Sequence, residues 1–226
     1  MPRAPRITGR MTAPERREQL LDVTAQLAVE RAFHGVSVEA VAQRAGITRA
    51  VVYQHFADLQ SLLEAVIERE TQRALAQVSE TTLEDLSRGE PVELMIESLR
   101  AYLCAVQNQP NTWRLVLMPP QGAPEMLHRA IAEGRASVLR RMARAVRPVL
   151  ATQPGVADAE LTARMLSAMA DEYARLVLVD PARFPPERML EHARWWLSEA
   201  SFAPAEPITR EPVVQRRRTK AIGNET

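Results

Sequence analysis

Apolar residues recur every three or four positions along most of this chain, which is the spacing of one face of an α-helix. Prolines divide these runs, and none lies between Pro14 and Pro91, so that interval can hold several uninterrupted helices. Further helical runs are predicted over 91–108, 111–118, 124–151, 157–179 and 186–201. The pattern therefore predicts an all-α protein.

The first helix begins at a sequence typical of a capping box. Thr12 and Glu15 stand three positions apart, where each side chain can bond the other's backbone amide, and Pro14 suits a first helical turn. We expect this helix to end near Gly35, with the glycine in the left-handed conformation that often closes a helix. A longer helix is expected after Asp58, which can cap its first turn.

Between these helices lie two short ones that form a helix-turn-helix. Residues 37–45 are predicted as the first, capped by Ser37, and residues 48–54 as the second, capped by Thr48. Gly46 supplies the tight turn between them. In a helix-turn-helix the first helix braces the second, whose N-terminal residues contact base edges in the major groove of DNA. The segment therefore predicts a DNA-binding unit.

Side chains on the second short helix have the chemistry for such contacts. Arg49 can donate two hydrogen bonds to a guanine, and Val51 can make apolar contact with a thymine methyl group. Tyr53 and His55 follow at the far end, where contacts to phosphate position a DNA-binding domain. The predicted DNA contacts are Ser37, Thr48, Arg49, Val51, Tyr53 and His55. The alternative for these residues is an ordinary capped and solvated surface helix.

At these residues the sequence resembles the TetR family of bacterial repressors. The resemblance runs over residues 15–63 and is carried by the A-G-I-T turn at 45–48 and the Y-Q-H-F ending at 53–56. Two positions differ from the family pattern: Ala50 replaces a glycine, and Leu59 stands where a lysine often contacts phosphate. The second difference either removes one phosphate contact that the family pattern would supply or leaves it to the basic arm with Arg3, Arg6 and Arg10.

The resemblance implies an N-terminal three-helix DNA-binding domain, followed by a helical bundle that dimerises through its last two helices and often encloses a small-molecule pocket. It implies a homodimer that represses transcription from a palindromic double-stranded DNA operator and is released by a small apolar or amphipathic effector. We expect a flexible basic arm over 1–11, the helix-turn-helix domain over 12–57, the ligand-binding and dimerisation domain over 58–202, and a disordered basic tail over 203–226.

Bulky side chains in the second half indicate where such a pocket and interface would lie. Methionine repacks around ligands of varied shape, and large apolar residues recur on the predicted bundle helices. The predicted pocket residues are Tyr102, Trp113, Met118, Met165, Met169 and Tyr173. The predicted interface residues on the last two helices are Leu161, Met165, Ala168, Glu172, Leu190, Ala193, Trp196 and Leu197. For each set the alternative is a plain intramolecular core.

The distribution of charge agrees with a phosphate-facing end. The first 56 residues carry eight Arg against five acidic residues, residues 57–202 carry sixteen Arg against twenty acidic residues, and residues 203–226 carry five basic against three acidic residues. Basic ends therefore flank an acidic body, as suits a molecule that presents one end to nucleic acid. The single cysteine, Cys104, makes no internal disulfide, and we expect it to be a buried, unreactive thiol.

Other classes of protein find little support. The sequence has no apolar run long enough to span a membrane and no secretory signal, so a cytoplasmic location is expected. It has no P-loop, G-x-G-x-x-G, G-x-S-x-G or H-E-x-x-H motif, so we expect no enzyme activity, no cofactor and no metal. One alternative is a helical small-molecule-binding or protein-interaction module without operator binding, which Leu59 in place of lysine keeps open. An activator of the same fold is a second alternative.

Overall fold

The computed structural model describes residues 11–82, 84–151 and 158–200. Within these ranges the regular structure is helical, with no strand. The helices are α1 (Ala13–Arg31), α2 (Val38–Ala45), α3 (Arg49–Tyr53), α4 (Leu59–Thr81), α5 (Pro91–Asn108), α6 (Pro110–Leu117), α7 (Glu125–Leu150), α8 (Ala159–Val179) and α9 (Pro186–Ala200), with two 3₁₀ turns, η1 (Phe33–Gly35) and η2 (Leu86–Arg88). The prediction of an all-α fold is confirmed.

Capping residues set the helix starts as the sequence predicts. At α1, Glu15 Oε2 accepts a hydrogen bond from the Thr12 amide at 2.7 Å, and the Thr12 hydroxyl accepts one from the Glu15 amide at 3.4 Å. At α4, Asp58 Oδ1 accepts from the Ser61 amide at 2.7 Å, and the Ser61 hydroxyl accepts from the Asp58 amide at 3.2 Å. Each pair satisfies backbone donors that the first helical turn leaves unpaired.

The end of α1 differs from the prediction. The helix stops at Arg31, and it is Ala32, with φ of 58°, that takes the left-handed conformation rather than Gly35. Gly35 lies in η1, where a Cβ atom would stand only 2.7 Å from the Cβ of Arg31. The glycine is therefore required by close approach of the chain to α1 and not by a positive φ.

Buried side chains form two cores. The first, which we call the head core, gathers α1, η1, α2, α3 and the first half of α4, and it includes Leu115 of α6 and Leu127 of α7. The second, the bundle core, gathers the end of α4 with η2 and α5 to α9. Leu62 and Val66 of α4 pack in the head core, whereas Ala74 of the same helix packs in the bundle core. One continuous helix is therefore part of both.

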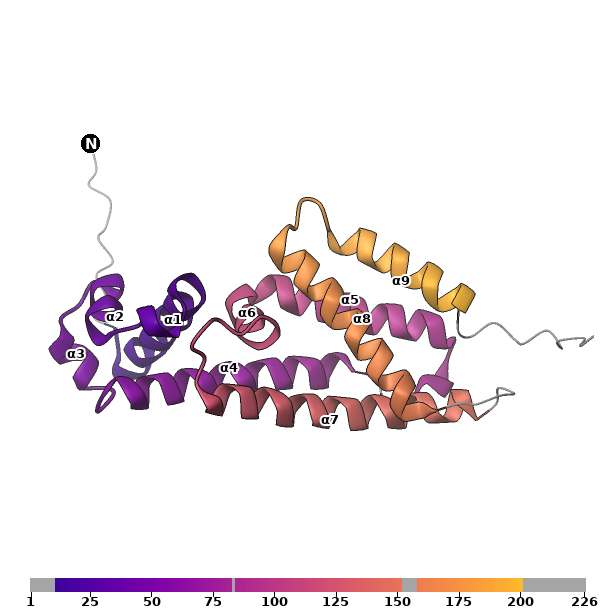
Figure 1. Cartoon of the computed structure of the whole chain (residues 1–226), viewed down its shortest axis with the longest axis horizontal. Helices are drawn as coiled ribbons and strands as arrows, with labels where there is room; N and C mark the ends of the chain where they lie inside the picture. The colour runs from indigo at the N-terminus through magenta and orange to yellow at the C-terminus, as the bar shows by residue number, and fades with distance from the viewer. Residues whose placement is uncertain (1–10, 83, 152–157, 201–226) are drawn as a thin grey trace, which may run out of the picture.

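The helices are arranged so that the head lies at one end of an elongated molecule (Figure 1). α4 leaves the head and runs beside α7 along one edge, and α8 crosses over α7 toward the other edge, where α9 packs on α5. The three helices α1, α2 and α3 stand apart from α5, α8 and α9, and α6 contacts both α1 and α4. This arrangement leaves α3 at the tip of the molecule.

Two further expectations can be compared with the described residues. Cys104 lies exposed on α5, so the prediction of a buried thiol is wrong; the buried face of that helix is occupied by Leu99, Leu103 and Val106. The expected tail over 203–226 lies outside the described residues, as does the arm over 1–11 apart from Met11. None of the described helices combines the length and apolarity needed to cross a bilayer.

Candidate nucleic-acid interface and ligand cavity

The turn between α2 and α3 is built by one cap and one glycine. The Ser37 hydroxyl accepts a hydrogen bond from the Ala40 amide at 3.1 Å and starts α2. Gly46 ends α2 with φ of 69°, a left-handed conformation that glycine adopts without steric cost. Val52 of α3 is buried in the head core, which fixes the side of α3 that faces outward. The geometry is that of the predicted helix-turn-helix.

The outward side of α3 carries the predicted base-contacting residues. Thr48 and Arg49 are exposed at its N-terminus, and Val51 is half-buried. Thr48 has the extended backbone of an N-cap, but its hydroxyl makes no capping bond to α3. Ser37 differs, because its hydroxyl is engaged in capping α2. The start of α3 therefore presents a hydroxyl and a guanidinium to solvent at the tip of the molecule.

Arg49 has a partner that the sequence did not reveal. Its Nη1 lies 2.6 Å from Oε1 of Glu39 in the first turn of α2, and both side chains are largely exposed. This hydrogen bond raises the pKa of Arg49 and lowers the pKa of Glu39 from their ordinary values. In the sequence Glu39 looks like any acidic residue near a helix N-terminus, so only the folded structure shows that it faces Arg49, the predicted base-contacting side chain.

The far end of the helix-turn-helix is anchored by an aromatic contact. Phe56 is buried in the head core, and the guanidinium of Arg17 lies 5.2 Å from its ring centroid. Tyr53 is exposed and His55 is half-buried. Leu59 packs against the head core, so the residue that replaces the family's lysine serves an apolar contact at the start of α4.

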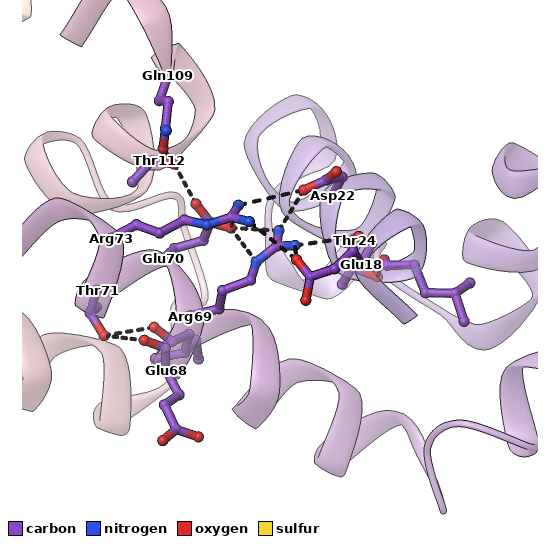
Figure 2. A network of polar contacts seen from close by, with 12 residues as sticks. Glu18, Asp22, Thr24, Glu68, Arg69, Glu70, Thr71, Arg73, Gln109 and Thr112 are labelled. Carbon is purple, nitrogen blue, oxygen red and sulfur yellow. Dashed lines mark hydrogen bonds and ion pairs between the residues drawn. The ribbon is translucent and has the colours of Figure 1, made fainter. Parts of the chain in front are cut away.

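An ion-pair network around the buried Glu70 joins α1 to the middle of α4 (Figure 2). Glu70 is almost fully buried, and its Oε1 lies 2.6 Å from Arg69 Nη2 and 3.4 Å from Arg73 Nη1. Arg69 also pairs with Glu18 at 2.9 Å and with Asp22 at 2.8 Å, both on α1. Burial opposes the charge on Arg69, but the surrounding carboxylates hold the pKa of its guanidinium above its ordinary value. Opposite charges of α1 and α4 thereby face each other in this contact between the two helices, which we call the joint.

The second oxygen of Glu70 extends this network to α6. The Thr112 hydroxyl donates a hydrogen bond to Glu70 Oε2, and the next residue, Trp113, donates from Nε1 to Gln77 Oε1 at 2.9 Å. Glu70 and Gln77 are two helical turns apart on α4, so α6 is held to α4 at two points. Sequence reasoning missed this joint, because Glu70 in a run of alternating Arg and Glu looks like a surface residue.

A largely apolar cavity of about 190 Å³ lies in the bundle, between α4, α5, α7 and α8. Of the predicted pocket residues, Tyr102, Trp113 and Met169 line it, and the Tyr102 and Trp113 rings meet edge to face with centroids 5.0 Å apart. Met118 and Tyr173 do not line it; Met118 packs against the bundle core, and the Tyr173 hydroxyl hydrogen-bonds His192 Nδ1 at 2.7 Å. Met165 does not line it either, because it is exposed on α8.

The predicted interface residues fall into two groups. Leu161, Met165, Ala168 and Glu172 are exposed along α8, and Leu161 and Met165 are each 60% exposed. Leu190, Ala193 and Leu197 of α9 are instead buried in the bundle core of the same chain, so in this fold they are not available to a partner. Trp196 is half-buried against that core, and its neighbour Trp195 is 60% exposed. On these last two helices, the large apolar side chains exposed to solvent therefore lie on α8 and at Trp195.

Solved structures share this architecture. A TetR-like transcriptional regulator from Rhodococcus sp. RHA1 has a TM-score of 0.64 at 22% identity and covers 83% of this chain and 97% of its own. SmeT, the repressor of the Stenotrophomonas maltophilia multidrug efflux pump SmeDEF, has a TM-score of 0.59 at 24% identity and covers 87% of this chain and 96% of its own. At these identities the likeness establishes the fold.

Sequence comparisons cover about half of the chain or less. Residues 20–66 match the family model of bacterial regulatory proteins, tetR family. The HTH-type transcriptional activator FasR of Mycolicibacterium smegmatis is 26% identical over 108 residues, 48% of each chain. An uncharacterised HTH-type transcriptional regulator of Mycobacterium tuberculosis is 31% identical over 131 residues, 56% of this chain and 55% of that protein. The chain thus spans about half the length of the curated relatives it matches.

The fold and the exposed edge of α3 define a class: all-α proteins with a helix-turn-helix head joined to a helical bundle. The family model covers the helix-turn-helix and the first part of α4, and the solved structures cover most of the chain. Residues 20–66 thus resemble the TetR family, and the described chain shares the fold of the solved TetR-like regulator and of SmeT.

Proposed function

We propose that the protein is a sequence-specific DNA-binding transcriptional regulator, a dimeric repressor that a small apolar or amphipathic effector releases from a palindromic operator. The observation that carries the proposal is the exposed start of α3, where Thr48 and Arg49 project from the tip of the head. The relatives support a transcriptional regulator, since FasR is a transcriptional activator, and SmeT supports the repressor, since it represses a multidrug efflux pump.

Each predicted DNA contact has a role in this proposal. Thr48 and Arg49 contact base edges in the major groove, and Val51 contacts a thymine methyl group. The exposed Tyr53 hydroxyl and the His55 ring contact phosphate beside the groove. Ser37 contributes through the N-terminus of α2, where backbone amides favour a phosphate group.

Dimerisation is assigned to the exposed face of α8, together with Trp195 of α9. Large apolar side chains that are exposed side by side on one helix are typical of an interface. Met165→Glu is expected to convert the dimer to a monomer in sedimentation equilibrium, because the charge would have to be buried against the partner. Cys104→Glu, which is exposed on α5, serves as the control and is expected to leave the dimer intact.

The effector site is assigned to the bundle cavity, within a ligand-binding and dimerisation domain over 58–202, and the operator site to a domain over 12–57. An effector that prefers one arrangement of the two heads shifts operator affinity by its differential affinity for the two arrangements. The hydrogen bonds of Thr112 and Trp113 to α4 place α6 between the cavity and the head. In this proposal, α6 and α4 transmit the effect of ligand binding from the cavity to the head.

The experiment that tests the proposal is selection from random duplex DNA with the purified full chain at about physiological salt. We expect a two-fold symmetric sequence whose half-sites lie about one helical turn of DNA, or a multiple of it, apart. Failure to enrich any sequence, with a dimer present in sedimentation, would overturn operator binding. It would favour the alternative of a helical small-molecule-binding or protein-interaction module.

A further inference from the structure

The bundle cavity has a distinct polar end. Most of its lining is apolar, including Val78 of α4, Met95 and Leu99 of α5, Met142 of α7 and Leu166 of α8. The charged residues in its described lining are Arg135 of α7 and Asp171 of α8. The cavity therefore offers a long apolar wall and a single place where charge is concentrated.

The two charges at this end neutralise each other. Arg135 Nη2 lies 2.5 Å from Asp171 Oδ2, and the Tyr102 hydroxyl donates a longer hydrogen bond, 3.4 Å, to Asp171 Oδ1. The Asp171 side chain is only 14% exposed, and burial raises the pKa of its carboxyl group although Arg135 and Arg175 act to lower it. Both carboxylate oxygens thus have a donor, and the site carries no net charge.

This arrangement restricts what a ligand can place there. A carboxylate head would face Asp171 and an ammonium head would face Arg135. Either ion would therefore have to break the pair or leave a charge uncompensated beside Asp171, whose side chain is 14% exposed against 48% for Arg135. An uncharged head can hydrogen-bond to the lining hydroxyl of Ser167, or donate to that of Ser98, whose own hydrogen is donated to the Thr81 carbonyl, and leave the pair intact.

We propose that the cavity takes an uncharged amphipathic molecule, with a long apolar body and one neutral hydrogen-bonding head group that lies beside the Arg135–Asp171 pair. The inference rests on the proposed role of the cavity as an effector site, and it narrows the effector to a chemical class. Fatty acids and cationic amphiphiles with ionised heads are excluded from that class.

Gly134 gives a way to close this site without disturbing the fold. It lies in the middle of α7 and lines the cavity, and a Cβ atom placed on it meets nothing within 4 Å. Replacement by alanine or leucine suits a helix interior better than glycine does. Gly134→Leu therefore fills cavity space, and Gly134→Ala is the matched control that leaves most of it open.

The test uses three probes with the same ten-carbon chain at neutral pH: 1-decanol below its solubility limit, and decanoate and decylammonium below their critical micelle concentrations. Binding to the full chain is measured by calorimetry and by the shift in thermal unfolding, without DNA. We expect decanol to bind at least about tenfold more tightly than either ion, since the ions must leave a charge uncompensated. Equal or tighter binding of either ion, or no binding of decanol, overturns the proposal.

Variants separate the charge argument from simple apolar binding. Gly134→Leu is expected to lose decanol binding and Gly134→Ala to keep it; equal binding by both overturns the assignment to this cavity. Asp171→Asn leaves Arg135 without its carboxylate partner, so decanoate should gain several-fold over decanol. An unchanged ratio of decanol to decanoate affinity in Asp171→Asn, with circular dichroism matching that of the unmodified protein, overturns the role of the pair.

These results are independent of operator binding. A charged preference in the probe series would overturn the ligand class and leave sequence selection on DNA unaffected. Failure of sequence selection would overturn the proposed regulator and leave the measured affinities of the three probes as they stand.

Discussion

Two arginine–glutamate contacts of equal length differ in almost every other respect. In the head, Arg49 and Glu39 lie 2.6 Å apart with side chains 63% and 61% exposed. At the joint between head and bundle, Arg69 and Glu70 also lie 2.6 Å apart, with side chains 12% and 2% exposed. The distance between the charges is the same, so solvent decides what each pair does.

Because water surrounds the Arg49–Glu39 pair, the two side chains can separate and take other partners easily. An exposed pair contributes little to stability, and either member can turn to another partner such as a base or a phosphate at small cost. The buried pair behaves differently, because removal of one member leaves the other charge buried and without that ionic partner. The head surface is therefore suited to changing partners, whereas the joint is suited to holding α1, α4 and α6 in one arrangement.

The largest expected effect comes from breaking the buried pair. Arg69→Met keeps most of the apolar stem but leaves Glu70 with Arg73 as its remaining cationic partner, and we expect the free energy of unfolding to fall by about 3 kcal/mol. Denaturation in urea measures the loss. The control, Arg164→Met, removes an exposed pair with Glu160 and is expected to cost less than about 0.5 kcal/mol. Similar losses in the two variants would remove the distinction between the regions.

The next effect concerns DNA and not stability. Arg49→Ala is expected to lower affinity for the selected operator about tenfold or more, since a bidentate contact to guanine contributes about 1–3 kcal/mol of discrimination. The midpoint of thermal unfolding should not change, because the side chain is solvated. Fluorescence anisotropy with the operator and an unrelated duplex measures both affinities. Arg88→Ala, with the same change in charge at an exposed residue of η2 in the bundle, should leave both unchanged.

A smaller effect tests whether Glu39 restrains Arg49 in the free protein. Glu39→Gln removes a negative charge from the surface proposed to face DNA and frees the guanidinium of Arg49, so affinity for unrelated duplex should rise about threefold with a steeper dependence on salt. Glu30→Gln is the matched control, because it breaks the comparable Arg44–Glu30 pair between α2 and α1. A rise of the same size in both variants would assign the effect to net charge alone.

The smallest effect depends on pH. Hydrogen bonds from the Ser61 amide and hydroxyl group lower the pKa of Asp58 below its ordinary value of 3.8. An acid with a lowered pKa in the folded state stabilises the fold above its unfolded pKa, and the stabilisation is lost as the pH falls through the folded pKa. Asp58→Ala should therefore unfold at a lower temperature than the unmodified protein at neutral pH. The difference should shrink as the pH falls below 3.8, and a constant difference would contradict this assignment.

The fold could be predicted closely, because local signals mark nearly every helix boundary. The capping pairs at Thr12 and Asp58 and the prolines of the second half act within one or two turns, and the observed helices of that half begin and end within two residues of the predicted ones. The exceptions depend on contacts between distant residues. Gly35 is required by its approach to Arg31, and Cys104 lies opposite the apolar face of α5.

The site could be predicted only in part, for the same reason. Thr48 and Arg49 follow from the position of α3 in a helix-turn-helix, but the pairing of Arg49 with Glu39 requires the packing of two helices. An apolar helix face does not tell whether it meets its own chain or a partner, and Leu197 is packed within its own chain whereas Met165 is exposed. Glu70 illustrates the limit most clearly, because its burial depends on α1, α4 and α6 together.

The shared helix α4 bears on how such proteins can be recombined. Leu62 and Val66 complete the head core and Ala74 completes the bundle core, while Leu115 and Leu127 reach back from the bundle into the head. In a hybrid that takes a foreign helix-turn-helix module up to residue 57, the module would pack against Leu62 and Val66 of this chain, which are not matched to its core. Grafts that carry α4, with the two leucines matched to it, keep both hydrophobic interiors whole, which makes α4 the unit of exchange for building chimeric biosensors.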